Sequence, residues 1–231
     1  MKKIILLLLS TISTSVFSQE EKIYTSLNEA HKTPDSVYHL DLSNQNLEEV
    51  PNDILLLKNL HVLNLSHNNI KEIDSTFFSL KNIKKLDLSH NQLDSIPNNI
   101  PNLISLKYLN LNHNYFKIFP ENIVRLESLE TLLFENNKLE ELPEQINLLK
   151  NLRKLYLTNN SLWLFPETFS GMKNLHFVDV SNNQLSQISN GLNSRSLRNL
   201  KKIIVTNNPF SSYEKGKIKF GVPKTCKIIW E

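Results

Sequence analysis

The sequence predicts an α/β solenoid: a curved stack of eight repeats with a parallel sheet on its concave face and short helical or 3-10 turns on its convex face. Three observations predict this fold. The pattern LxxLxLxxNxL recurs along the chain, its copies follow one another at a fixed spacing of 23 residues, and most copies carry a proline at one phase of their second half. Self-similarity at a fixed period of about 20–29 residues is the signature of a repeat array.

The copies stay in phase along most of the chain. Seven of them are separated by 23 residues, and the last step is 25 residues. They start at Val37, Leu60, Ile83, Leu106, Leu129, Leu152, Leu175 and Leu200. The LxL centre alternates apolar and polar residues, which predicts a short strand with one buried face. One repeat cannot bury its apolar stripe alone, so stacking must create a continuous leucine core.

The second half of each repeat predicts the convex side. Its apolar residues recur at spacings of three and four, which suits a helical or 3-10 turn. Proline is tolerated in the first turn of a helix, so a proline there indicates where the convex segment begins. The prolines at this phase are Pro51, Pro97, Pro120, Pro143 and Pro166.

An asparagine recurs where the chain leaves each strand. Its amide group carries both donors and acceptors, so it can satisfy backbone groups at the inward bend. We interpret the series as a structural asparagine ladder, replaced in the first repeat by Gln45. The ladder consists of Asn68, Asn91, Asn114, Asn137, Asn160, Asn183 and Asn208.

This combination of LxxLxLxxNxL and a proline-containing second half resembles the leucine-rich repeat family in its 23-residue form, over residues 37–210. Outside the repeats, residues 1–18 are predicted to be a signal peptide, 19–36 an N-terminal cap, and 211–231 a C-terminal cap. The N-terminal cap contains SLNEA, a capping-box pattern that predicts a short helix. The C-terminal cap is predicted to hold a helix and a final strand, with Cys226 in the phase of Ile203.

The first residues predict export. Lys2 and Lys3 precede an apolar run that is too short for a good membrane span, and small residues then provide a cleavage site after Ser18. The alternative is a retained amphipathic anchor; we expect no stable membrane insertion after cleavage. Removal of 1–18 takes away two lysines and no acids, so the formal charge falls from +3 to +1. This nearly neutral balance argues against a nucleic-acid partner.

Cofactor and catalytic motifs are missing from the sequence. Four glycines form no GxGxxG or GxxxxGK loop, one cysteine forms no CxxC pair, and HExxH and GxSxG do not occur. We therefore expect no cofactor, no catalytic residues and no enzymatic activity.

Three histidines, His67, His90 and His113, share one phase in consecutive repeats. Imidazole binds zinc and nickel, so a metal site is one interpretation. However, side chains about 4.8 Å apart on adjacent strands do not converge on one ion without distortion. Asparagine takes the same position in other repeats, so we interpret it as a surface position open to any polar residue, and we expect no metal site.

The outward positions of the strands change character along the stack. They are polar in the first three repeats, except for Val62, and become apolar and aromatic in repeats four to seven. Aromatic residues flanked by charge are typical of energetic hot spots at interfaces. The expected partner-binding residues on the concave face are Tyr108, Leu133, Glu135, Lys154, Tyr156, Phe177 and Asp179.

The sequence thus predicts an exported, non-catalytic protein that binds a protein partner through its concave face. Its resemblance to exported bacterial leucine-rich repeat proteins implies a secreted, surface or periplasmic location and a role in adhesion or host interaction. The alternative is a structural or glycan-contacting component of the cell envelope, which would use polar concave residues and the lysines of the C-terminal cap.

Overall fold

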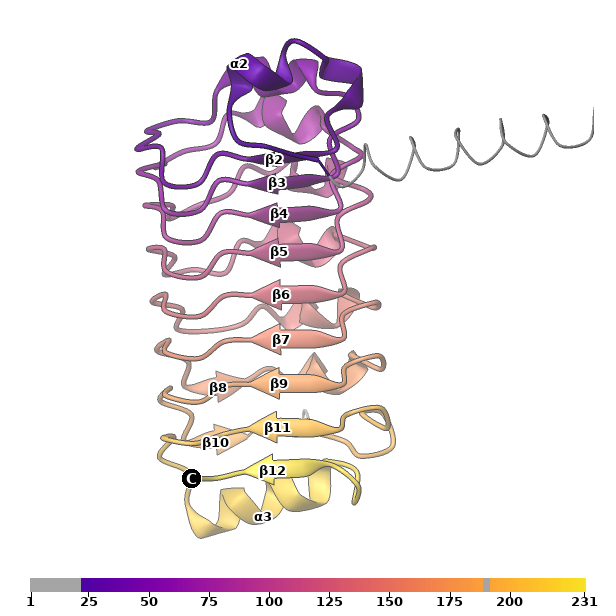
Figure 1. Ribbon diagram of the computed structural model, residues 1–231. Helices are drawn as coiled ribbons and strands as arrows, with labels where there is room; N and C mark the ends of the chain where they lie inside the picture. The colour runs from indigo at the N-terminus through magenta and orange to yellow at the C-terminus, as the bar shows by residue number, and fades with distance from the viewer. Residues whose placement is uncertain (1–21, 189–191) are drawn as a thin grey trace, which may run out of the picture.

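The computed structural model describes residues 22–188 and 192–231, so the predicted signal peptide lies outside the described residues. The predicted fold class is confirmed: within this part of the chain, ten parallel strands form one sheet in the order β1-β2-β3-β4-β5-β6-β7-β9-β11-β12 (Figure 1). The strands are β1 (Ile23–Tyr24), β2 (His39–Asp41), β3 (Val62–Asn64), β4 (Lys85–Asp87), β5 (Tyr108–Asn110), β6 (Thr131–Leu133), β7 (Lys154–Tyr156), β9 (Phe177–Asp179), β11 (Lys202–Ile204) and β12 (Lys227–Ile229).

Equivalent positions of successive repeats pair directly across the sheet. Leu63 of β3 lies opposite Leu40 of β2 on one side and Leu86 of β4 on the other. These leucines are fully buried, and the second leucine of each LxL motif is buried with them. Complete burial of one such side chain stabilises the fold by about 1.5–3 kcal/mol. The stack therefore has one continuous core that runs through every repeat.

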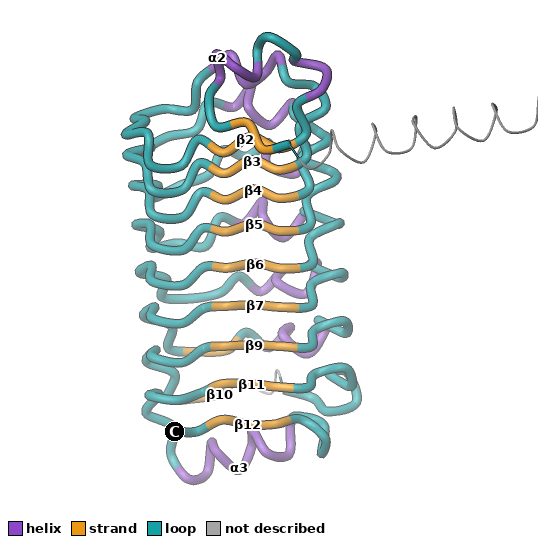
Figure 2. The backbone as a smooth tube through the Cα atoms, viewed as in Figure 1, coloured by secondary structure: helices purple, strands orange, loops and turns teal. Residues whose placement is uncertain are grey.

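The convex side consists mainly of 3-10 turns behind the strands (Figure 2). The 3-10 turns are η1 (Pro34–Ser36), η2 (Asn52–Leu56), η3 (Ser75–Ser79), η4 (Ile100–Asn102), η5 (Glu121–Arg125), η6 (Glu144–Leu148) and η7 (Glu167–Gly171). A proline with extended backbone directly precedes η2, η5, η6 and η7. Strands β8 (Leu164–Phe165) and β10 (Gln187–Ile188) pair in a second, two-stranded sheet on this side.

A second amide ladder, which the sequence analysis missed, ties the convex turns together. Asn82 Nδ2 donates to the carbonyl oxygen of Lys58 in the preceding repeat at 2.9 Å, and Asn151 Nδ2 donates to that of Glu127 at 2.7 Å. Asn59, Asn174 and Asn199 make the same contact. The signal was present in the sequence as a second asparagine at a constant phase, preceded by Lys or Arg.

The N-terminal end is closed by two elements. Helix α2 (Leu27–Ala30) begins at Ser26, whose hydroxyl accepts from the N–H of Glu29 at 3.4 Å, as the capping-box pattern predicts. Strand β1 precedes it and pairs with β2, which the sequence analysis did not predict. A strand of two residues carries too little alternation to be detected by pattern.

At the C-terminal end, α3 (Ser212–Gly221) leads into β12. The predicted register of this last strand is wrong: Ile228, not Cys226, pairs with Ile203. A turn in which the Cys226 N–H donates to the Pro223 carbonyl adds two residues before the strand. Cys226 is consequently only half-buried, and this burial raises the pKa of its thiol to about 11, which keeps the thiol protonated at neutral pH.

A partly buried ion pair fastens α3 to the stack. Glu214 accepts from the N–H of Ile188 at 2.8 Å, and Lys217 Nζ donates to the carbonyl oxygen of the same residue at 2.8 Å. Lys217 and Glu214 also pair with each other at 3.1 Å. The backbone N–H and carbonyl oxygen of Ile188 are thereby satisfied at the edge of β10 that α3 covers. Backbone groups at a covered sheet edge need such partners.

Candidate partner-binding face

Each ladder asparagine lies between two repeats. Asn114 is 4% exposed, and its Nδ2 lies 3.0 Å from the carbonyl oxygen of Leu88 and 3.2 Å from that of Leu111. Its Oδ1 accepts from the N–H of Leu93 at 3.0 Å. Leu88 and Leu93 belong to the preceding repeat, so one amide joins two successive turns. The same arrangement holds for Asn68, Asn91, Asn137, Asn160, Asn183 and Asn208.

The residue before each ladder asparagine has a left-handed backbone, with φ between 53° and 57°. This conformation costs most residues about 1–2 kcal/mol, and asparagine and histidine are among those that adopt it most often. The interpretation of this position as open to any polar residue is therefore wrong. The residues concerned are Asn44, His67, His90, His113, Asn136, Asn159, Asn182 and Asn207.

The three histidines of this row form a stack of parallel rings. The ring centroids of His67 and His90 are 4.0 Å apart with an interplanar angle of 11°, and those of His90 and His113 are 4.0 Å apart at 15°. Parallel rings direct their nitrogen lone pairs alongside one another instead of toward a common point. Among the described residues, no group of three or more His, Cys, Asp or Glu side chains is placed to hold a metal ion.

The histidine stack makes a testable prediction about pH. Burial and the neighbouring His113 and His67 lower the pKa of His90, against an opposing effect of Asp87. A lowered pKa means that the unfolded chain takes up this proton at a higher pH than the folded chain, so stability is lost as the pH falls below about 6.5. We expect the melting temperature to fall on acidification from pH 7.5 to 5.5, and to fall less in His90→Asn.

Asparagine suits the left-handed backbone at position 90, so the variant removes the titration without adding strain. The converse variant, Asn136→His, extends the stack by one ring next to His113 and should steepen the pH dependence. Equal slopes in all three proteins, measured by differential scanning calorimetry, would contradict this account.

A further row of side chains on the concave face stabilises the turns. The last strand residue of a repeat accepts, through its side-chain oxygen, from the backbone N–H two residues later: Asp87 from Ser89 at 3.0 Å and Asp179 from Ser181 at 3.0 Å. Asp41, Asn64 and Asn110 make the same bond. This Asx geometry is a local preference of Asp and Asn at turns. Asp179, which was predicted to contact a partner, thus also supports its own turn.

Leu133 and Tyr156 interrupt this row. They occupy adjacent strands, directly opposite each other, at the position where five other repeats place Asp or Asn. Neither side chain can make the Asx bond, and both are partly exposed on the sheet. Such a pair across two strands adds some stability to the sheet, but neither residue stabilises its turn as an Asp or Asn would.

Two of the three predicted aromatic residues, Tyr156 and Phe177, come together on the sheet. The rings of Tyr156 and Phe177 lie 4.9 Å apart at 38°. Lys202 Nζ lies 5.6 Å from the centre of the Phe177 ring, and Lys85 Nζ lies 4.9 Å from that of Tyr108. Lys154 is exposed and pairs in register with Phe177. Six of the seven predicted residues therefore surround one partly exposed apolar patch, with Tyr108 two strands away from Tyr156.

The carboxylate of Glu135 lies beside this patch. Asn112 donates to it at 2.8 Å, and burial nevertheless raises the pKa of Glu135, with Asp179 adding to the effect. Burial also raises the pKa of Tyr108 and of Tyr156, and the negative charge of Glu135 acts on both in the same direction. The patch is therefore partly desolvated and negatively charged along one side.

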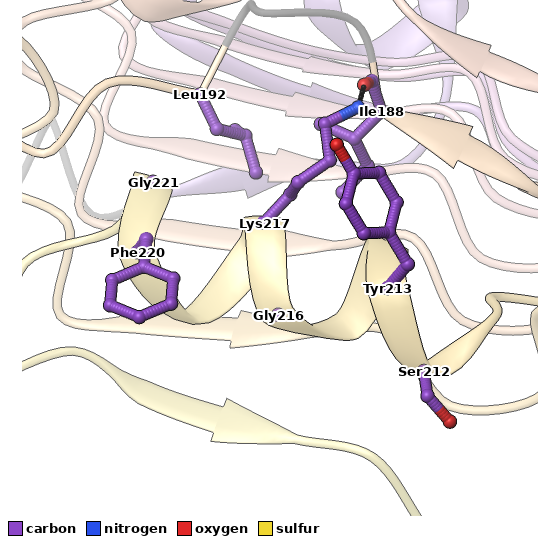
Figure 3. A pocket seen from close by; sticks show the side chains of 8 residues that line it. All are labelled: Ile188, Leu192, Ser212, Tyr213, Gly216, Lys217, Phe220 and Gly221. Carbon is purple, nitrogen blue, oxygen red and sulfur yellow. Dashed lines mark hydrogen bonds between the residues drawn. The ribbon is translucent and has the colours of Figure 1, made fainter.

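A cavity of about 470 Å³ lies elsewhere, between α3 and β10 (Figure 3). Tyr213 and Phe220 on its rim are 74% and 87% exposed. Of its lining residues only Tyr213 and Lys217 are ionisable, and Lys217 is held by Glu214 and by the carbonyl oxygen of Ile188. None of the predicted partner-binding residues lines it, and its side chains offer no paired acid and base.

The repeated strand–turn unit and its asparagine ladder define a class of repeat protein, and comparison with known families identifies it. A model described as a leucine-rich repeat region matches residues 86–218, and a second leucine-rich repeat model matches residues 35–93. The chain belongs to the leucine-rich repeat family. This family typically provides non-catalytic scaffolds for interaction through an extended surface. A search of curated proteins finds no match.

Solved structures share the fold. One is internalin C2 from Listeria monocytogenes str. 4b F2365, with 27% identity, a TM-score of 0.68, and coverage of 78% of this chain and 75% of that chain. Another is TLR13 in a complex with ssRNA13, with 28% identity, a TM-score of 0.75 and coverage of 92% of this chain. The chain spans only 31% of the length of that TLR13 chain. Among the described residues, no helix is both long enough and apolar enough to span a membrane.

Proposed function

We propose that this chain is an exported, non-catalytic binding protein that holds a protein partner against its concave face. The predicted signal peptide and the similarity to internalin C2 support export to the surface, the periplasm or the medium. Adhesion and host interaction are the processes that such binding would serve. No cofactor enters the proposal.

One observation carries the proposal: Leu133 and Tyr156 replace turn-stabilising Asp or Asn on two adjacent strands. A substitution that gives up a local hydrogen bond and exposes apolar surface is unfavourable for the isolated fold. It becomes favourable when a partner covers the site, because burial of aromatic and aliphatic side chains drives association. Phe177 extends the same patch onto a third strand.

The rim of the patch favours a polypeptide. Lys154 and Glu135 place opposite charges beside the apolar centre, which gives orientation and specificity more than raw affinity. TLR13, whose structure is a complex with RNA, shows that this fold can also meet a nucleic acid. In this chain the carboxylates of Asp87, Glu135 and Asp179 lie on the same face. They would repel a polyanion such as a nucleic acid.

The test compares the full-length chain with a Tyr156→Glu/Phe177→Glu variant. Both are used as bait for extracellular and envelope proteins and for isolated cell wall. A matched control, Leu56→Glu/Ile118→Glu, changes two apolar residues that are 60% and 79% exposed outside this patch. Thermal unfolding first establishes that the three proteins are equally folded.

We expect a specific protein to be retained by the full-length chain and by the control, and to bind the concave variant more than about tenfold more weakly. Equal retention of that protein by all three baits would overturn the concave assignment. Retention of cell wall by all three, without any protein, would favour the structural or glycan-contacting alternative.

A further inference from the structure

Charges on the concave face are sorted by sign across the strands. The side where the strands begin carries Lys85, Lys154, Lys202 and Lys227 at the first strand position. The position just before the strands adds Lys84, Lys107, Arg153 and Lys201. Glu130 is the one acid in these two rows among the described residues, and it is already paired with Lys107 at 3.1 Å and Arg153 at 3.8 Å. We name this side the basic edge.

On the opposite side the charged residues of two rows are acids, and the stack of His67, His90 and His113 lies directly beyond them. At the last strand position and two residues beyond it, the charged side chains of repeats one to eight are Asp41, Asp87, Glu135 and Asp179. No lysine or arginine occurs in these rows of the repeats. Within the described part of the chain, none of these four carboxylates forms a salt bridge. We name this side the acidic edge.

The two edges neutralise each other only in part. Strand residues rise by about 3.3 Å each, so the first and last residues of a three-residue strand lie roughly 7 Å apart, and the rows before and beyond the strand lie farther apart. That distance is close to the screening length of about 8 Å in physiological salt. Each edge therefore presents its own sign to solvent.

The Asx bonds account for an Asp or an Asn at the last strand position, but the fold alone does not account for the lysines that gather at the other edge. Opposite charges on neighbouring strands attract, whereas like charges placed along one edge repel. Stability would be better served by alternating signs from one repeat to the next, as Lys107, Glu130 and Arg153 do locally. The segregation is instead what electrostatic complementarity to a partner requires.

We propose that the partner presents a polypeptide element that lies along the solenoid axis, with acidic side chains on one flank, basic side chains on the other, and apolar side chains between them over Leu133, Tyr156 and Phe177. This inference rests on the proposed function and specifies the chemistry of its partner. An α-helix with its side chains is about 10–12 Å wide, so it is wide enough to contact both edges at once. A polyanion such as RNA would be attracted by the basic edge but repelled by the carboxylates of the acidic edge.

The experiment uses the full-length chain to select binders from a display library of random peptides of about 16 residues, which as a helix span roughly 24 Å. The acid-neutral variant is Asp41→Asn/Asp87→Asn/Glu135→Gln/Asp179→Asn; asparagine keeps the Asx bond, as Asn64 and Asn110 show. The base-reversed variant is Lys85→Glu/Lys154→Glu/Lys202→Glu. A single-stranded RNA oligonucleotide is tested as a competing ligand.

We expect the selected peptides to segregate acids from bases on either side of an apolar centre. The acid-neutral variant should lose the preference for basic residues, and the base-reversed variant should replace acidic residues by basic ones. Each set of substitutions should weaken the original peptides by at least about tenfold at low salt. Peptides without charge segregation, or RNA that displaces the peptides from the unmodified chain, would overturn the proposal.

The Tyr156→Glu/Phe177→Glu variant separates this inference from the proposed function. If that variant keeps the selected peptides, binding does not use the concave patch and both proposals fail. If it loses them while the two charge variants keep them, the concave function stands and only the charge segregation is refuted.

Discussion

Replacing Asn114 with alanine is expected to lower the free energy of unfolding by about 3 kcal/mol or more, because a buried polar group left without its partner costs about 1–3 kcal/mol. Several groups would be left so: the carbonyl oxygens of Leu88 and Leu111 lose a donor, and the N–H of Leu93 loses its acceptor. Leu93 is completely buried, so water cannot readily replace the amide.

Two further variants identify the cause. Asn114→Asp keeps an acceptor for Leu93 but places a carboxylate against carbonyl oxygens, so it should destabilise the chain at least as much as alanine does at neutral pH. His113→Asn alters the adjacent residue while keeping one that suits the left-handed backbone, and it should remain near the wild type. Urea unfolding followed by circular dichroism measures all three; an Asn114→Ala protein within about 0.5 kcal/mol of the wild type would contradict the ladder's role.

Phe134→Ala is expected to cost about 3–5 kcal/mol, the range found for removing a buried aromatic ring. Phe134 is completely buried, with ring centroids 5.0 Å from Phe116 and 5.5 Å from Phe119. It stands where the neighbouring repeats have Leu111 and Leu157. Deleting the ring therefore opens a cavity in the centre of the stack, and two aromatic contacts are lost with it.

Phe134→Leu is the matched control. Leucine is the residue of the adjacent repeats and leaves a smaller cavity than alanine does, so Phe134→Leu should destabilise the chain less than Phe134→Ala. Guanidinium unfolding of the two variants beside the wild type measures the difference. If leucine and alanine destabilise the chain equally, the loss does not come from cavity formation and the interpretation of Phe134 as a core ring is wrong.

The sequence predicted the repeat architecture because its signal is long-range and redundant. A constant spacing of 23 residues fixes which strands are neighbours, and the buried leucines then define the register. Where redundancy ended, prediction failed. Strand β1 has two residues and no repeat to match, and a turn before β12 adds two residues, so Ile228 takes the position expected for Cys226.

The candidate site could be predicted in part. The alternation of apolar and polar residues in each strand identified which side chains point outward. It placed Tyr156 and Phe177 on the concave face, where their rings lie next to each other. It could not show that Asp179 also caps a turn, because the Asx bond depends on backbone geometry. Nor could it explain why histidine and asparagine share the position before the ladder, since the left-handed φ of His90 is not visible in a pattern of polar letters.

The asparagine ladder also gives the stack a direction. The side chain that completes the turn of one repeat comes from the next: Leu47 donates to Asn68, and Leu93 to Asn114. Since a chain is synthesised from its N-terminus, each repeat stays incomplete until another 21 residues have followed. The last of these turns, at Leu185, waits for Asn208, and α3 follows directly after it. A nascent chain would therefore always end in one unfinished turn, until Asn208 closes the turn at Leu185 just before the C-terminal helix.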